Sequence, residues 1–176
     1  NFFMATESLR KDHDLIEKVV QAMQVTLDLL KSGKKIPESI LMPTLDFTTN
    51  FTDVCHHGKE EESFFPALEQ TGMPRNMGPI ATMLMEHEIT RQIAIKMTAS
   101  AKEYLQTGKP DGLVSDITQY IEHMGAHLWK ENNRLFMMAE MRLQGQSEKM
   151  NSALSEVEKK KLEQLGKTRA DYETLV

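Results

Sequence analysis

The stretch CHHGKEEESFFP, residues 55–66, places two histidines and three glutamates directly before an apolar pair. Residues four apart share one face of a helix, so His57 would lie with Glu61, or His56 with Glu60. Imidazole and carboxylate groups are costly to bury unless something inside the protein binds them. The stretch therefore predicts a helix that carries metal-ligating side chains into a core.

The segments on either side of this stretch also have helical spacing, with apolar residues at steps of three and four and few turn-forming residues between them. The four segments predicted to be long helices are residues 9–30, 37–70, 80–107 and 111–143. Pro43 and Pro66 lie inside the second segment and should distort its start and kink its end. Four long helices with short connections predict an all-α protein built as an antiparallel up-down four-helix bundle.

A polar linker and one more helix are expected after the bundle. Residues 152–175 predict this last helix, opened by a capping box of Ser155 and Glu158. We therefore expect two parts, a metal-binding bundle over residues 1–145 and a linker with a C-terminal helix over residues 146–176. The last helix would pack on the bundle or on a partner chain, and a homodimer is one form of the second arrangement.

Length, charge and composition restrict the class of protein. The 176 residues suffice for one domain with an appendage. The net charge of -5 comes from acidic and basic residues mixed along the chain, without the basic stripe that nucleic acid binding needs. No apolar run approaches the roughly 20 residues that span a bilayer, and no signal peptide is recognisable. A single cysteine, Cys55, forms no internal disulfide and suits a reducing compartment, so we expect a cytoplasmic protein without a membrane partner.

A second histidine and glutamate four apart, His127 and Glu131, lie on the apolar face of the fourth predicted helix. Single histidines, His13 and His87, occupy core positions of the first and third. Left without a partner, each buried polar group would cost on the order of 1 to 3 kcal/mol. Converging on the bundle axis, these groups would instead supply ligands for two metal ions, with the glutamates bridging them. The expected ligands are His13, His57, Glu61, His87, His127 and Glu131.

Helical phase is the reason for choosing His57 and Glu61 in the second helix. The residues three and ten positions before His57 are apolar, Val54 and Phe47, whereas the same steps back from His56 lead to aspartates. The face that carries His57 is therefore the apolar one. His56 would point outward or hold a ligand in place.

A comparison of the two histidine-glutamate pairs favours the alternative register. Aligning the Lys-Glu dipeptides of the two segments matches His56 with His127 and Glu60 with Glu131. In this register His56 and Glu60 are the ligands of the second helix. The two registers stay open as alternatives.

This set of histidines and glutamates resembles the hemerythrin-like HHE cation-binding domain over roughly residues 6–143. Within that family, the MGPI run at residues 77–80 and the ENNRLF run at residues 131–136 look most like the di-iron proteins that repair damaged iron centres. The chain is less similar to the oxygen-carrying hemerythrins. These place a second histidine four residues after the ligand of the third helix, where this chain has Arg91.

The resemblance and the ligand set imply two iron ions, and manganese suits the same donors. Two ferrous ions facing two carboxylates leave an excess of roughly two positive charges, which favours an oxide or hydroxide bridge. His123, one turn before His127, is either a further ligand or a hydrogen-bonded neighbour. We expect a protein that binds or reacts with dioxygen, peroxide or nitric oxide, in iron-centre repair or the response to oxidative stress. The alternative is an iron or oxygen sensor, or an iron-storage protein, without catalytic turnover.

Overall fold

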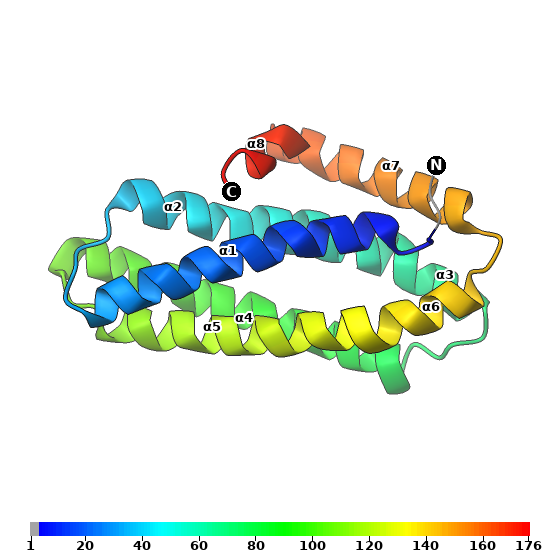
Figure 1. Cartoon of the computed structure of the whole chain (residues 1–176), viewed down its shortest axis with the longest axis horizontal. Helices are drawn as coiled ribbons and strands as arrows, with labels where there is room; N and C mark the ends of the chain where they lie inside the picture. The colour runs from blue at the N-terminus through cyan, green and yellow to red at the C-terminus, as the bar shows by residue number, and fades with distance from the viewer. Residues whose placement is uncertain (1–3) are drawn as a thin grey trace.

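Four long helical segments lie lengthwise beside one another (Figure 1). The computed structural model describes residues 4–176, and no strand occurs among them, so the predicted all-α class is confirmed. The first segment is α1 (Glu7–Lys31) and the third is α4 (Gly78–Thr107). The second consists of α2 (Glu38–Asp46), η1 (Phe47–His57), η2 (Glu60–Phe64) and α3 (Phe65–Gln70). The fourth consists of α5 (Asp111–Lys130), η3 (Glu131–Leu135) and α6 (Phe136–Arg142).

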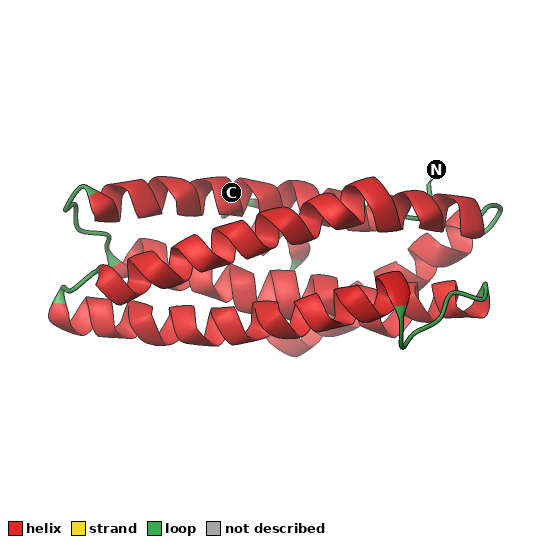
Figure 2. Cartoon of the chain, turned by 90° about the horizontal axis from the view of Figure 1, so that it is seen from below, coloured by secondary structure: helices red, strands yellow, loops and turns green. Residues whose placement is uncertain are grey.

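The segments pack in a ring. Helix α5 contacts both α1 and α4, and η1 contacts the same two helices from the other side. The loops that join the segments gather at the two ends of the molecule (Figure 2). None of the helices in the described part of the chain is both long and apolar enough to cross a membrane.

The elements η1, η2 and η3 are π-helical, with each N–H bonded to the carbonyl five residues earlier rather than four. A π turn takes in more residues than an α turn, so the direction of side chains shifts relative to a 3.6-residue period. The second segment continues through both prolines, because Pro43 lies within α2 and Pro66 lies in the first turn of α3. The departure from α-helical geometry falls between the prolines.

Two apolar clusters fill the interior, and polar residues separate them along the long segments. In α1, His13 lies between Leu9 of one cluster and Ile16 of the other. His87 is placed in the same way within α4. The structure thus contains a buried polar layer across its middle, which includes every expected ligand except Glu61.

The C-terminal part differs from the prediction in its bounds. Helix α7 (Ser147–Leu165) begins before the predicted start at residue 152 and ends at Gly166, whose φ of +66° suits glycine. A short helix, α8 (Arg169–Glu173), follows. The capping box predicted at Ser155 is wrong, since the one that forms joins Thr168 and Asp171 at the start of α8. Helix α7 packs along η1, η2 and α1.

Candidate metal centre

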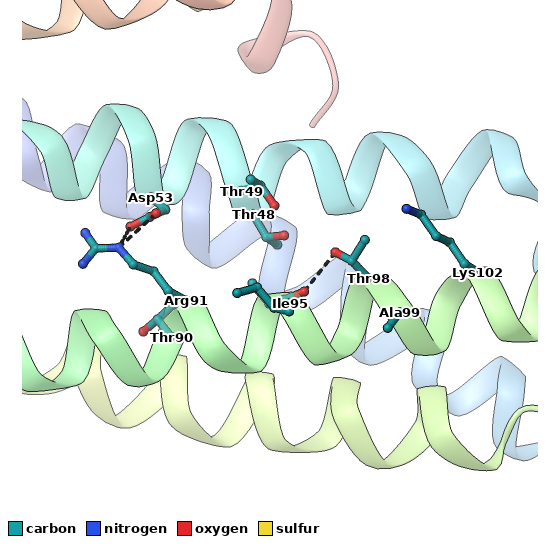
Figure 3. A pocket seen from close by; sticks show the side chains of 10 residues that line it. Thr48, Thr49, Asp53, Thr90, Arg91, Ile95, Thr98, Ala99 and Lys102 are labelled. Atoms are coloured by element: carbon teal, nitrogen blue, oxygen red, sulfur yellow. Dashed lines mark hydrogen bonds and ion pairs between the residues drawn. The ribbon is translucent and has the colours of Figure 1, made fainter.

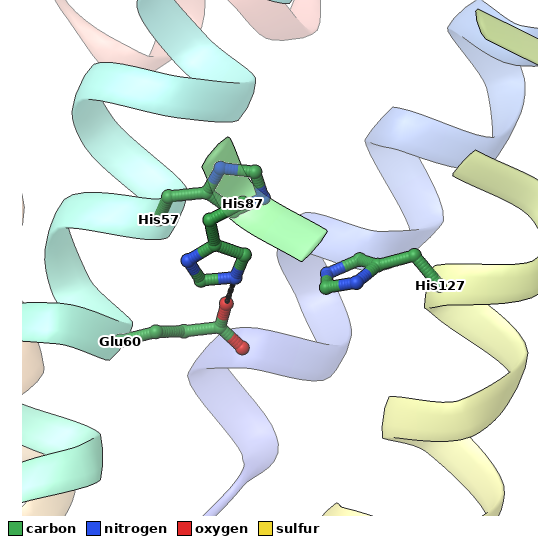
Figure 4. A group of neighbouring side chains, drawn as sticks. All are labelled: His57, Glu60, His87 and His127. Carbon is green, nitrogen blue, oxygen red and sulfur yellow. Dashed lines mark ion pairs between the residues drawn. The ribbon is translucent and has the colours of Figure 1, made fainter. Parts of the chain in front are cut away.

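Seven buried side chains form two groups of nitrogen and oxygen donors in the polar layer. The three-histidine group consists of His57, Glu60, His87 and His127, and the two-histidine group consists of His13, His56, Glu60 and Glu131. Within each group the donor atoms all lie within 4.8 Å of one another, and none of the seven side chains is more than 1% exposed. Figure 4 shows the first of these groups, in which Nε2 of His87 lies 3.0 Å from Oε1 of Glu60. Glu60 belongs to both groups.

Each of the five imidazoles has its Nδ1 atom bonded to an oxygen outside the groups. These outer acceptors are Asn132 for His13, Asp12 for His56, Asp53 for His57, Glu61 for His87 and Glu86 for His127, at 2.7 to 3.0 Å. Since an amide or carboxylate oxygen accepts, Nδ1 carries the hydrogen and donates it. The lone pair of Nε2 is thereby turned inward, as metal-ligating histidines require.

Several of the inward atoms have no hydrogen-bond partner. They are Nε2 of His87, Nε2 of His127, both carboxylate oxygens of Glu60 and Oε2 of Glu131. In addition, the Nε2 atoms of His13 and His56 face each other at 3.2 Å, where either a proton on one of them or a bound cation removes the repulsion between two lone pairs. Neutral imidazole nitrogens and carboxylate oxygens are ligands of divalent first-row metals. The donor set therefore fits metal ions, which would satisfy all of these atoms together.

The pKa values of the two buried carboxyl groups, Glu60 and Glu131, are shifted in opposite directions. Burial and the negative charge of Glu131 raise the pKa of Glu60 well above its ordinary value. Burial alone would raise the pKa of Glu131 too, but the nearby imidazole of His127, together with hydrogen bonds from His13 and His56, holds it well below the usual range. In the metal-free protein, Glu60 therefore keeps its proton to a higher pH than Glu131 does.

The histidines also differ between the groups. Burial, together with the neighbouring imidazoles, lowers the pKa of His57 well below its ordinary value, and burial lowers the pKa of His87. Burial would lower the pKa of His56 as well, but its hydrogen bond to Asp12 and the charge of Glu131 raise it instead. The three-histidine group thus contains imidazoles that are neutral and able to bind a metal at neutral pH, whereas His56 keeps its proton to a higher pH than an ordinary imidazole.

The structure places Glu61 outside both groups. Its Oε2 atom accepts from Nδ1 of His87 and from Nη2 of Arg91, each at 2.7 Å. Nε of Arg91 also bonds to Asp53 at 2.9 Å, at the edge of a groove of about 620 Å³ between η1 and α4 (Figure 3). The predicted pair is therefore split: His57 faces the interior, and Glu61 orients another imidazole.

The π-helical geometry explains why neither register is realised alone. His56 and His57 both end η1 and face inward, together with Glu60, which opens η2. The prediction from helical phase, which counts three and ten residues back from each histidine, assumes 3.6 residues per turn. This assumption does not hold for η1, which is π-helical. The comparison of the two pairs gives the better result for the carboxylate, since Glu60 opens η2 as Glu131 opens η3.

His123 lies beside the centre and outside both groups. Its Nε2 atom contacts the hydroxyl of Thr90 at 2.7 Å and the backbone carbonyl of Glu86 at 3.1 Å. Apart from Glu61, which was expected to bind metal itself, the outer acceptors were not predicted from the sequence. A signal existed for one of them, because Asp53 stands four residues before His57 on the same helix.

In a comparison with models of known protein families, residues 4–139 match the Hemerythrin HHE cation binding domain. The chain belongs to the hemerythrin HHE family. This confirms the resemblance expected from the sequence, and the matched part of the HHE chain contains all seven inward donors. The match ends before α7 and α8. No curated protein and no solved structure matched the chain in the two other comparisons.

Proposed function

We propose that this HHE chain holds two iron ions, one in each donor group, and binds or reacts with a small oxidant such as dioxygen, peroxide or nitric oxide. The observation that carries the proposal is the position of Glu60, whose carboxylate faces both groups. Glu131 supports it, because its Oε1 atom lies 3.0 Å from Nε2 of His13 and 3.5 Å from Nε2 of His127. Carboxylates shared in this way are suited to bridge two ions. The proposed ligands are His13, His56, His57, Glu60, His87, His127 and Glu131.

The bundle would serve as the scaffold for these ligands. In this proposal the four long segments form an antiparallel up-down four-helix bundle, and residues 1–145 are the metal-binding part. Residues 146–176 pack on that part through α7 and α8. Ligands contributed by every long segment fix the distance between the two groups, because each helix is held by the apolar clusters on both sides of the polar layer.

The protein residues orient the ligands and exclude water. The outer acceptors hold each Nδ1 hydrogen, and the ring of Phe136 stacks on His13 with centroids 4.9 Å apart. Four protein ligands in each group would leave coordination positions open for oxide, hydroxide or the oxidant. Bound iron would supply the electron transfer with the oxidant, which no side chain of the centre can supply.

Metal analysis of the protein purified from its native host, together with its visible absorption spectrum, tests the proposal. We expect two iron ions per chain and charge-transfer absorption that changes when peroxide or nitric oxide is added. One ion per chain, or two manganese ions with no response to oxidant, would contradict the proposal. Catalytic removal of peroxide would identify an enzyme.

A sensor without turnover is the second candidate, and one observation favours it. Arg169 of α8 contacts Asp12, the outer acceptor of His56, so the C-terminal segment is connected to the centre. For a sensor we expect stoichiometric oxidation, together with a change in how α7 and α8 pack or in the oligomeric state. Repeated turnover with no such change would exclude this candidate.

A further inference from the structure

A chain of charged contacts joins the metal centre to α8. Nη1 of Arg169 donates to Oδ1 of Asp12 at 2.7 Å, and Oδ2 of Asp12 accepts from Nδ1 of His56 at 2.8 Å. Asp12 is fully buried. Arg169 lies well beyond residue 139, where the family match ends. A residue outside the matched domain therefore contacts the carboxylate that orients a proposed ligand.

Two more charges complete this cluster. Nζ of Lys59, itself fully buried, lies 2.8 Å from Oδ2 of Asp12 and 3.0 Å from Oε1 of Glu158 in α7. Nη1 of Arg169 lies 2.8 Å from the same oxygen of Glu158. Both oxygens of Asp12 are thus engaged, one by His56 and Lys59 and the other by Arg169. Buried charges are stable only when every member is paired, so removal of one cation should disturb the rest.

The other carboxylates among the outer acceptors are held by cations of the matched domain. Arg91 contacts Asp53 and Glu61, and Lys130 contacts Glu86. These three carboxylates orient His57, His87 and His127. The three-histidine group is therefore supported from within residues 4–139, whereas the two-histidine group also depends on α8.

We propose that Arg169 is a positioning residue for the metal ion held by His13 and His56, and that docking of α8 controls how firmly this ion is retained. Arg169 acts through Asp12, which fixes the His56 ring so that Nε2 faces the ion. The ion held by the three-histidine group is independent of Arg169. This inference rests on the proposed binding of two ions.

The test measures how fast each ion leaves the full chain. The wild type and its variants are loaded with Fe²⁺ without oxygen and mixed with a chelator that absorbs visible light when it binds Fe²⁺. Arg169→Gln is expected to release one ion per chain on the order of tenfold faster. Loss of a group bonded to a ligand histidine typically lowers metal affinity roughly 10- to 100-fold, and the lower end applies because Arg169 acts through Asp12. The other ion should leave at the wild-type rate. Arg169→Lys should give an intermediate rate for the same ion, because lysine keeps the charge but lacks the planar fork of arginine.

Glu173→Gln is the matched control. Glu173 bonds to Nε of Arg169 at 3.3 Å on the solvent side and does not contact Asp12, so this variant should release both ions at the wild-type rates. If Arg169→Gln accelerates both ions equally, it loosens the whole fold and the proposal is wrong. If it accelerates neither, the contact with Asp12 has no effect on the ion and the proposal is also wrong. If Arg169→Gln does not fold, Arg169→Lys is used in its place. Equal acceleration of both ions, or acceleration of neither, would again show that the proposal is wrong. A wild type that holds fewer than two ions contradicts the proposed function itself, before any variant is compared.

Discussion

The Nε2 atoms of His13 and His56 lie 3.2 Å apart in the buried polar layer, while their Nδ1 atoms are bonded outward to Asn132 and Asp12. With both Nδ1 hydrogens committed outward, the two rings direct their Nε2 atoms at the same point. A proton retained by His56 or a bound cation must lie between these atoms, because two facing lone pairs repel. A bound metal ion would take the place of that proton. Binding of metal and stability of the fold are consequently linked in this protein.

The first prediction concerns removal of the metal. Unpaired ligand atoms such as Nε2 of His127 and Oε2 of Glu131 destabilise the metal-free fold, and bound metal would satisfy them. A ligand that binds only the folded state adds about 4 kcal/mol when its free concentration is a thousand times Kd. Iron-loaded protein should therefore melt at a clearly higher temperature than chelator-treated protein in calorimetry. Identical melting temperatures would contradict metal binding at these residues. As a control, the His123→Ala variant should keep the difference in melting temperature between iron-loaded and metal-free protein, because His123 lies outside both groups.

The second prediction separates Glu60 from Glu61. Glu60→Gln should lose both ions, because the shared carboxylate supports both groups. Glu61→Gln should still hold two ions at saturation, with affinity for one of them lowered on the order of tenfold, since Glu61 only orients His87. Iron per chain and charge-transfer absorption measure both results. The reverse outcome would restore the register in which His57 and Glu61 are the ligands.

The third prediction is a release of protons when metal binds. In the metal-free protein the pKa values of Glu60 and His56 are raised, so both groups hold protons at a pH where free carboxyl and imidazole groups have begun to lose them. Metal displaces these protons, roughly one to two per chain, and affinity should rise with pH for as long as they remain bound. Titration with metal in a weakly buffered dye solution measures the release. Affinity that falls or stays level between pH 6 and pH 8 would contradict the assignment, and Glu60→Gln should not show the part of the release that comes from Glu60.

The fourth prediction concerns Cys55. Burial raises the pKa of its thiol to about 12, so at pH 8 only about one molecule in ten thousand carries the thiolate. Iodoacetamide should therefore label the folded protein very slowly and the denatured protein rapidly, as followed by mass spectrometry. Rapid labelling of the folded protein would indicate a reactive thiol and a role in redox sensing.

The sequence predicts the helices and most of the side chains that meet in the polar layer, and the reason lies in what side-chain spacing can encode. Single histidines such as His13 and His87 stand on regular α-helices, where a 3.6-residue period correctly indicates which face is buried. The period is misleading for Glu61, because this residue lies within the π-helical element η2, shortly after η1, and nothing in the composition of either element indicates an i to i+5 pattern. The repeated Lys-Glu dipeptide was the better guide to Glu60, because it compares two sites that have the same local geometry.

Contacts between distant residues account for what the sequence does not predict. In the sequence, Asp12 is simply a polar residue beside His13. Its role in orienting His56 becomes apparent only in the structure, where Lys59 and Arg169 contact it. Local periodicity contains no information about such pairs. The end of α7 at Gly166 was missed for a simpler reason, since the charged residues around it continue a helical pattern on both sides.

Arg169 is added to the growing chain 157 residues after Asp12, the carboxylate that it contacts. Because proteins are synthesised from the N-terminus, every proposed ligand is already in place along the chain before this arginine exists. If each group binds one ion as proposed, the three-histidine group would be complete as soon as the long helices have assembled. The two-histidine group would gain the contact between Arg169 and Asp12 only later. The order in which the two ions become firmly bound would then follow the order of translation.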